Sequence, residues 1–312
     1  MIKKTTFFIL ALFSTASIAE NICNVTIVSH RGGSGLLENS VQGARLAFQT
    51  FDSVEVDLQR LNDGAWVVHH DPLLGRSSQN SRNTPSLLAT MSSSQWKGVR
   101  HKEGTSTGDP VPFVSDLLNV AHKSKPFNFE IKGLASATSL KQLDKKLKSH
   151  LGSNYHYSSM DIGILKTIRK INKSVYLGVI QAPETKSASK AVTTSPKYSK
   201  LKSKWDDKAK KWGVNIKQVE AKVMDKYATS TVDYAHNLDL ISKLGNAGLH
   251  LDFQTVRSNI NVLSQAKKRG LDVYTYDIDD KRKHLTFISN LKNQSRPTGV
   301  ITDLKVSDWC SR

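Results

Sequence analysis

Cysteine is scarce in this sequence, since only Cys23 and Cys310 occur among its 312 residues. Too few thiolates are present to build a cysteine-rich zinc site. The two cysteines lie near opposite ends of the chain, and in an oxidising compartment a disulfide between them would tie those ends together. Two unpaired thiols are the alternative; we expect the disulfide.

Long apolar runs are missing as well, apart from one at the N-terminus. Two lysines precede an apolar run from residue 7 to residue 13, and small residues follow with the spacing for cleavage after Ala19. This is the pattern of a secretory signal peptide over residues 1–19. A membrane-spanning helix needs about 20 apolar residues, more than this run supplies. We therefore expect a mature chain of residues 20–312 that is periplasmic or secreted.

Acidic residues are outnumbered, with 27 Asp and Glu against 45 Lys and Arg, and the formal net charge is +18. Loss of the signal peptide removes two lysines and leaves +16. Such a charge attracts nucleic acid, anionic membrane surfaces or phosphate-bearing substrates, although it is equally compatible with simple solubility. Basic residues interleaved with aromatic ones, as in nucleic-acid binders, do not occur. We expect no nucleic-acid partner and leave open a transient contact with a membrane surface.

The glycine patterns of nucleotide-binding folds are also absent, because no GxGxxG or P-loop spacing opens a helix. This weighs against a doubly wound open sheet. The chain instead alternates short apolar strands with helical stretches, which is typical of a parallel sheet. Leaving aside a hairpin strand at 65–70 that follows the second strand, we expect eight strands, at 25–29, 53–58, 127–131, 155–158, 175–180, 248–253, 271–276 and 298–302. Helices are expected at 40–51, 137–150, 161–171, 257–269 and 280–291. Eight such units predict a single (β/α)₈ barrel, the TIM barrel fold.

Two stretches interrupt the alternation. Residues 75–110 are rich in Ser, Thr, Gly and Asn and are expected to form a long loop with a little helix. Residues 183–245 are rich in lysine, mostly helical in pattern and far longer than an ordinary connection. This second stretch fits a lid, a membrane-facing element or an elaborated outer helix, and a solvated charged face is the simplest interpretation.

Polar residues gather where the strands of the predicted barrel end, which is where barrel enzymes place their active sites. These residues are His30 and Arg31 after the first strand, Glu55 and Asp57 on the second, His70 and Asp71 on the hairpin strand, and Glu130 and Lys132 on the third. Residues at i and i+2 of a strand point to the same side, so Glu55 and Asp57 are presented together, and so are Glu130 and Lys132.

Three of the four carboxylates, those on the second and third strands, would repel one another in one barrel mouth unless a cation lay between them. Glu55, Asp57 and Glu130 therefore predict a site for one oxygen-preferring divalent cation, Ca²⁺ or Mg²⁺. His30 and His70 are suited to proton transfer, one as base and one as acid.

Arg31 and Lys132 add positive charge for an anionic substrate. A divalent cation, cationic side chains and two histidines together suit the cleavage of a phosphodiester. We expect a small phosphodiester substrate and a monomeric protein.

Several short motifs occur in the order typical of the glycerophosphodiester phosphodiesterase family, which this chain resembles. They are HRGG at 30–33, ENS at 38–40, EVD at 55–57, DGAWVVHHD at 63–71 and FEIKG at 129–133. Later similarity at 158–159, 267–280 and 299–303 extends the resemblance over most of the mature chain. The resemblance implies a (β/α)₈ barrel and metal-dependent hydrolysis of glycerophosphodiesters to an alcohol and glycerol 3-phosphate.

The resemblance also implies a role for each matching residue. His30 and His70 correspond to the catalytic pair, and the motif selects His70 over His69. The remaining correspondences are Glu55, Asp57 and Glu130 as metal ligands, Arg31 and Lys132 as phosphate-contacting residues, and Glu38 and Asp71 as supporting residues.

The chain departs from the family pattern in a few places. Leu37 stands where proline is common, ENS replaces ENT, and Tyr276 stands where tryptophan is usual. We expect Tyr276 to offer the substrate an aromatic wall. Two other functions stay open: a phospholipase D-like enzyme acting on lysophospholipid or sphingolipid at a membrane surface, and a non-catalytic barrel that only binds.

Overall fold

The computed structural model describes residues 25–33, 38–82, 86–102, 107–133, 135–181, 234–276, 287–288, 290–291 and 296–309. The predicted signal peptide, Cys23 and Cys310 lie outside these ranges, as do most of the lysine-rich stretch and most of the helix expected at 280–291. No described helix is long and apolar enough to cross a membrane.

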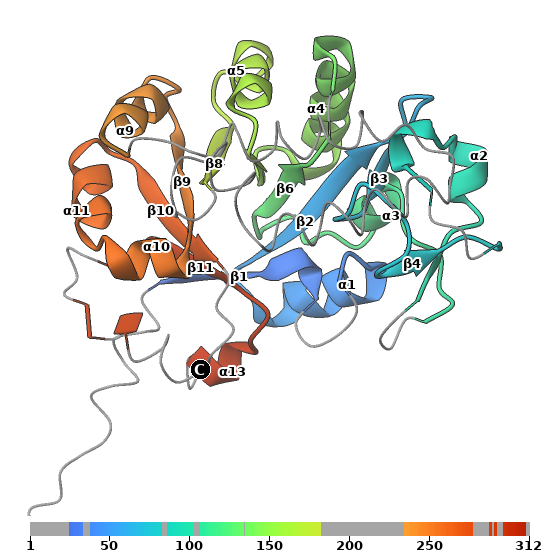
Figure 1. The fold of residues 1–312 in the computed structure, drawn as a ribbon, viewed down its shortest axis with the longest axis horizontal. Coiled ribbons are helices and arrows are strands. Elements are labelled where there is room, and N and C mark those ends of the chain that lie inside the picture. The colour runs from blue at the N-terminus through green and yellow to red at the C-terminus, as the bar shows by residue number, and fades with distance from the viewer. Residues whose placement is uncertain are drawn as a thin grey trace, which may run out of the picture.

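Eight parallel strands form a closed barrel (Figure 1). The first strand pairs with the second on one side and with the last on the other, so no edge is left open. The strands are β1 (Thr26–Ser29), β2 (Ser53–Arg60), β6 (Phe127–Ile131), β7 (Tyr155–Ser159), β8 (Tyr176–Gln181), β9 (Ala247–Asp252), β10 (Asp272–Tyr276) and β11 (Gly299–Thr302). All eight lie within two residues of their predicted bounds, and the predicted (β/α)₈ fold is confirmed.

A ninth strand, β3 (Trp66–Val68), pairs antiparallel with the end of β2, with Leu58 opposite Val68. The turn between them includes Gly64 at φ +92, a left-handed conformation that glycine adopts most readily. The chain thereby doubles back over the carboxyl end of β2 and delivers residues 69–71 to the rim of the barrel.

Helices on the outside of the barrel cover its strands (Figure 1). They are α1 (Val41–Thr50), α3 (Val114–Leu118), α4 (Ala137–Leu151), α5 (Ile162–Ile171), α9 (Tyr234–Ser242), α10 (Phe253–Ser258), α11 (Asn261–Lys268) and α13 (Val306–Trp309). Leucines spaced by three and four residues form the buried stripe of α4, at 140, 143, 147 and 151. The first turn of α5 is capped by Asp161, whose Oδ1 accepts hydrogen bonds from two backbone amides.

One helix prediction was wrong in extent. The single helix expected at 257–269 is two helices, because Asp252 caps α10 directly at the end of β9 and starts it earlier. At Asn259 the backbone then leaves the helical region, with φ −136 and ψ 68, before α11 begins.

Residues 75–110 are more ordered than the loop expected there. They contain the short strands β4 (Ser78–Gln79) and β5 (Arg100–His101), which pair with each other, the 3₁₀ turn η3 (Leu88–Thr90) and the helix α2 (Ser93–Trp96). A small second core forms around Trp96, which is fully buried and donates its indole N–H to the carbonyl of Val111 at 3.0 Å. A large aromatic anchor thus organises a stretch whose composition predicts little structure.

The barrel interior near the amino ends of β8 to β10 is filled by large polar aromatic side chains. His250 lies 5.2 Å from Tyr274 between ring centroids, and Gly178 on the neighbouring strand makes room for it, because a Cβ there would lie 2.3 Å from its ring. Burial lowers the pKa of His250 to about 3. This histidine is therefore neutral in the folded protein at ordinary pH.

Candidate active site

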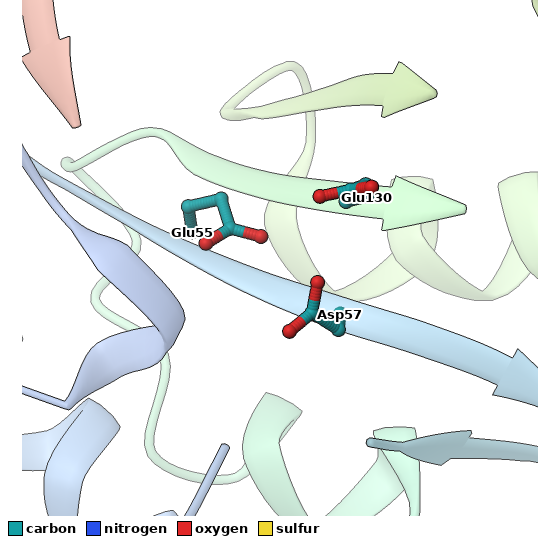
Figure 2. Close-up of side chains that lie close together, drawn as sticks. All are labelled: Glu55, Asp57 and Glu130. Carbon is teal, nitrogen blue, oxygen red and sulfur yellow. The ribbon is translucent and has the colours of Figure 1, made fainter. Parts of the chain in front are cut away.

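Three buried carboxylates from two neighbouring strands meet at the centre of the site. Glu55 and Asp57 point to one side of β2, and the register of the sheet sets Asp57 opposite Glu130 on β6. Ligand oxygens of the three side chains lie within 4.8 Å of one another, and each residue is at most 8% exposed (Figure 2). The structure therefore brings together the three residues predicted as metal ligands.

Two cations partly balance this negative charge. The Nζ of Lys132 lies 2.6 Å from Glu130 Oε1 and 3.0 Å from Asp57 Oδ1, and the Nε of Arg31 lies 3.4 Å from Asp57 Oδ2. Burial alone would raise the pKa of Asp57, but the charges of Lys132 and Arg31 are among those that hold it well below its usual range. Asp57 is accordingly firmly ionised.

Glu55 is less completely paired. Its Oε2 accepts a hydrogen bond from the backbone N–H of Arg31 at 2.8 Å, but its buried Oε1 has no hydrogen-bond partner among the described residues. Burial, followed by the charge of Asp57, raises the pKa of Glu55 to about 8. A buried carboxylate oxygen that has no hydrogen-bond partner among the described residues and lies among other anions is suited to coordinate a cation.

The turn after β1 places Arg31. Residues His30–Gly32 form the 3₁₀ turn η2, in which Arg31 adopts a left-handed conformation with φ 55. Gly32 packs so closely on α1 that a Cβ would lie 3.2 Å from the backbone of Ala44. This turn directs the guanidinium of Arg31 at Asp57 and at Glu38, whose Oε2 accepts from Nη1 at 2.6 Å.

Asn39 is a site residue that the sequence argument did not single out. Its amide nitrogen donates to Asp57 Oδ2 at 2.8 Å, and its amide oxygen accepts from the backbone N–H of Asp57 at 3.0 Å. It too has a positive φ, of 56, which asparagine tolerates better than most residues. The signal that could have identified Asn39 is its place beside Glu38 in the ENS motif, because an asparagine side chain in a turn can form a hydrogen bond with a neighbouring backbone group.

The two predicted catalytic histidines are each held by a carboxylate at Nδ1. His70 lies 2.7 Å from Asp71 Oδ1, and His30 lies 3.1 Å from Asp303 Oδ1. Burial, followed by the charge of Lys132, lowers the pKa of His70 to about 4. Burial would also lower the pKa of His30, but the hydrogen bond to Asp303 and nearby negative charge outweigh it and the pKa is raised.

Asp303 and Arg76 were also missed by the sequence argument. Asp303 directly follows β11 and reaches a histidine that follows β1, because these strands are neighbours in the closed barrel. Arg76 comes from the long loop, donates from Nε to Asp71 Oδ2 at 2.6 Å, and also pairs with Glu38. Only the closed fold reveals these contacts, since a salt bridge between distant segments leaves no local pattern.

His69 faces away from the carboxylates, as the alternation of the strand predicts. It is buried, with Nδ1 2.7 Å from the carbonyl of Asp71 and Nε2 2.7 Å from Ser78 Oγ, and it packs edge-on against Trp96. Its contacts join the hairpin to the second core. Tyr276, expected as an aromatic wall, lies at the end of β10 and donates its hydroxyl to the carbonyl of Gln181 at the end of β8.

The sequence of residues 30–304 matches the glycerophosphoryl diester phosphodiesterase family. The chain belongs to this family. The match spans every motif discussed above, from His30 of the first turn to Asp303. The protein is accordingly a phosphodiesterase, and the structure shows the barrel of the glycerophosphoryl diester phosphodiesterases carrying its acidic cluster at the carboxyl ends of the strands.

Solved structures of similar proteins agree with this fold. A phosphodiesterase from Oleispira antarctica, in complex with the product sn-glycerol-3-phosphate, is 17% identical, with a TM-score of 0.62 over 91% of this chain and 94% of the other. Glycerophosphodiester phosphodiesterases from Parabacteroides distasonis and Agrobacterium tumefaciens are 14% and 16% identical, with TM-scores of 0.60 and 0.59. They cover 91% and 90% of this chain, and 95% and 97% of their own. A search among curated proteins found no match.

In this glycerophosphoryl diester phosphodiesterase the observed arrangement can perform two tasks. The acidic cluster of Glu55, Asp57 and Glu130 can hold an oxygen-preferring cation. His30 and His70 each have one ring nitrogen bonded to an aspartate, which fixes the orientation of the ring and leaves Nε2 as the nitrogen for proton exchange.

Proposed function

We propose that this protein hydrolyses glycerophosphodiesters to an alcohol and glycerol 3-phosphate, using one divalent cation held by Glu55, Asp57 and Glu130. The observation that carries the proposal is the convergence of three buried carboxylates within 4.8 Å at the strand ends, in a family whose members cleave such diesters. Family membership supplies the reaction class, and the cluster supplies the reason for a cation.

The residues present fit Ca²⁺ or Mg²⁺. All three candidate ligands offer carboxylate oxygens, the donors that these hard cations prefer, and the buried Oε1 of Glu55 accepts no hydrogen bond from any residue that the structure describes. When bound, such a cation would polarise a phosphoryl oxygen and offset the charge that develops on it. The calcium ion is the more available of the two outside the cytoplasm, and we propose it for that reason.

The histidines account for the protons. In the proposed reaction a water oxygen bonds to phosphorus while the bond from phosphorus to the alcohol oxygen breaks. One histidine accepts a proton from the water and the other donates a proton to the departing alcohol. Asp71 and Asp303 keep His70 and His30 in orientation through Nδ1.

The side chains of Arg31 and Lys132 have two proposed roles: they balance the charge of the carboxylates, and they attract the anionic substrate. Both lie within 3.4 Å of Asp57, so they complement its charge and add positive potential where a phosphodiester would bind. We propose Tyr276 as part of the wall that faces the substrate, since it lies on the strand-end face of the barrel.

Turnover of two substrates tests the proposal. Purified protein is incubated with glycerophosphocholine and with lysophosphatidylcholine, each with and without EDTA. Release of glycerol 3-phosphate from the first, abolished by EDTA and restored by Ca²⁺ or Mg²⁺, is the expected result. Turnover of the lysolipid alone would favour a phospholipase D-like enzyme at a membrane surface, and turnover of neither would favour a binding barrel.

We further propose that the protein acts outside the cytoplasm as a monomer, with residues 1–19 removed and Cys23 joined to Cys310. The basis is the charged-then-apolar N-terminal pattern and the paired cysteine count. Expression with the intact N-terminus, followed by mass spectrometry of the extracytoplasmic fraction, should give a chain beginning at Glu20 and two hydrogens lighter than its reduced form. A cytoplasmic chain that begins at Met1 would refute the location.

A further inference from the structure

Arg76 forms ion pairs with two carboxylates of the active site, Asp71 and Glu38. Its Nε donates to Asp71 Oδ2 at 2.6 Å, and its Nη2 pairs with Glu38 Oε1. These two nitrogens lie along one edge of the planar guanidinium, so a single side chain holds both acceptors in a fixed relation. The proposed reaction assigns no role to this arginine, although it contacts both supporting residues of the site.

Each of these two carboxylates also contacts a residue of the proposed reaction. Asp71 uses its other oxygen, Oδ1, for the Nδ1 of His70 at 2.7 Å. Glu38 uses its other oxygen, Oε2, to accept from the Nη1 of Arg31 at 2.6 Å. Arg76 therefore links the imidazole proposed for proton transfer to the guanidinium proposed to attract the phosphodiester, through an unbroken chain of hydrogen bonds.

Positive and negative charges alternate along this chain, and Arg76 supplies the positive charge between the two carboxylates. Burial would raise the pKa of Glu38, but the hydrogen bond to Arg76 and the charge of Arg31 lower it. Burial would also raise the pKa of Asp71, but its contacts with His70 and Arg76 lower it. Without the guanidinium of Arg76, two ionised carboxylates would repel each other where they now share one cation. The groups that they hold would then lose their fixed orientation.

The backbone on either side of Arg76 is anchored at the paired strands β4 and β5. Gly75 donates its amide to the carbonyl of Ser78 at 2.8 Å, and the carbonyl of Ser77 accepts from the amide of Lys102 at 2.9 Å. Both serines are buried, whereas the side chain of Arg76 is 46% exposed. Because exposed ion pairs contribute little to stability, removal of the guanidinium should leave the fold of this segment intact.

We propose that Arg76 is a positioning residue, which acts on the reaction through its contacts with Asp71 and Glu38. The contact with Asp71 fixes the imidazole of His70 for proton transfer. The contact with Glu38 fixes the guanidinium of Arg31 where the diester is attracted. The inference rests on the proposed hydrolysis of glycerophosphodiesters and adds to it a residue from the long segment 75–110, away from the strand ends.

Steady-state kinetics of three variants with glycerophosphocholine separate the two contacts. Asp71→Asn should act mainly on kcat, because it disturbs proton transfer, and Glu38→Gln mainly on KM, because it disturbs the attraction of the substrate. Arg76→Gln should change both and lower kcat/KM about 10–100-fold, the range typical for removal of a residue that orients an active-site group. In a protein that already carries Asp71→Asn and Glu38→Gln, adding Arg76→Gln should cost less than about two-fold, because both contacts are already altered.

Arg82→Gln is the matched control, because it removes one positive charge from an exposed residue of the same segment and should leave kcat and KM unchanged. Arg76→Lys keeps the charge but lacks the planar pair of donors, so it should keep the wild-type Tm and recover only part of the lost kcat/KM. The Tm of Arg76→Gln should lie within about 4 °C of the wild-type value. The proposal is overturned if Arg76→Gln leaves kcat and KM unchanged, if Arg76→Lys restores both in full, or if Arg76→Gln costs as much in the double variant as in the wild-type protein.

Crystal structures of the wild-type protein and of Arg76→Gln separate this inference from the proposed hydrolysis. If the wild-type protein hydrolyses no diester with Ca²⁺ or Mg²⁺ present, but the variant shows the side chains of His70 and Arg31 displaced, the hydrolysis fails and the positioning role stands. If both side chains keep their wild-type positions in the variant, the positioning role is refuted whatever the activity.

Discussion

Asn39 offers the sharpest test of how the acidic cluster is held. Its side chain satisfies both the backbone N–H and the Oδ2 of Asp57, and the residue is 3% exposed. Removal of the amide leaves two buried polar groups of Asp57 short of a partner. Each such loss costs about 1–3 kcal/mol, so Asn39→Gly should lower the free energy of unfolding by about 2–6 kcal/mol.

A second variant isolates the backbone contribution. Asn39 has φ 56, which glycine adopts without strain but alanine does not. The free energy of unfolding of Asn39→Ala should therefore be lower than that of Asn39→Gly by about 1–2 kcal/mol. Urea denaturation of the two variants in parallel gives the two contributions separately.

The functional consequence follows from the position of Asp57. When an orienting partner of a metal ligand is removed, metal affinity or activity typically falls about 10–100-fold. In Asn39→Gly the concentration of Ca²⁺ or Mg²⁺ that gives half-maximal activity should rise by that factor, whereas saturating metal should recover much of the rate. An unchanged metal dependence in a destabilised Asn39→Gly would refute the reasoning and reduce Asn39 to a structural residue of the turn.

Three further predictions concern the histidines and the cation. His70→Ala should abolish turnover. His69→Ala should lower the free energy of unfolding by about 2–4 kcal/mol, because the contacts with Ser78 and the second core are lost, but it should keep much of the activity at temperatures where the variant is folded. The reverse pattern would overturn the assignment. Addition of Ca²⁺ or Mg²⁺ at about 100 times its dissociation constant should stabilise the protein by about 2.7 kcal/mol and raise Tm by several degrees, with no such shift in Glu130→Gln. The folded pKa of His250 is about 3 against 6.5 for the unfolded chain, so the unfolded state takes up this proton first and stability falls as pH drops below 6.5. Between about pH 6.5 and pH 4.5 the wild-type protein should lose about 2.3 kcal/mol more than His250→Gln in urea denaturation, and parallel pH profiles would contradict the burial of a neutral ring.

The barrel could be predicted because its strands have a strong local pattern. Short apolar runs such as 53–58 and 127–131 alternate with helical stretches. A count of eight such strand–helix units is typical of a (β/α)₈ barrel. The convergence of Glu55 and Asp57 was also readable, since residues two apart on a strand share a face. Their meeting with Glu130 required only that the second and third strands of the barrel be neighbours.

What could not be predicted depends on contacts between distant segments. Arg76 lies in a stretch of low complexity, and only the packing around Trp96 gives that stretch the shape that brings its guanidinium to Asp71 and Glu38. The break at Asn259 was missed for a different reason, because the helical pattern continues across it and the earlier start set by Asp252 comes from the end of a strand.

The hydrogen bond between His30 and Asp303 has a consequence for when the site is completed during folding. The two residues are 273 positions apart and meet only because β11 completes the barrel against β1. A polypeptide still emerging from the ribosome or crossing a membrane already possesses every residue of the acidic cluster, yet it lacks the aspartate that orients this imidazole. In the proposed mechanism, where His30 exchanges a proton, hydrolytic competence is acquired only when β11 closes the barrel against β1, and the activity recovered during refolding should follow that closure.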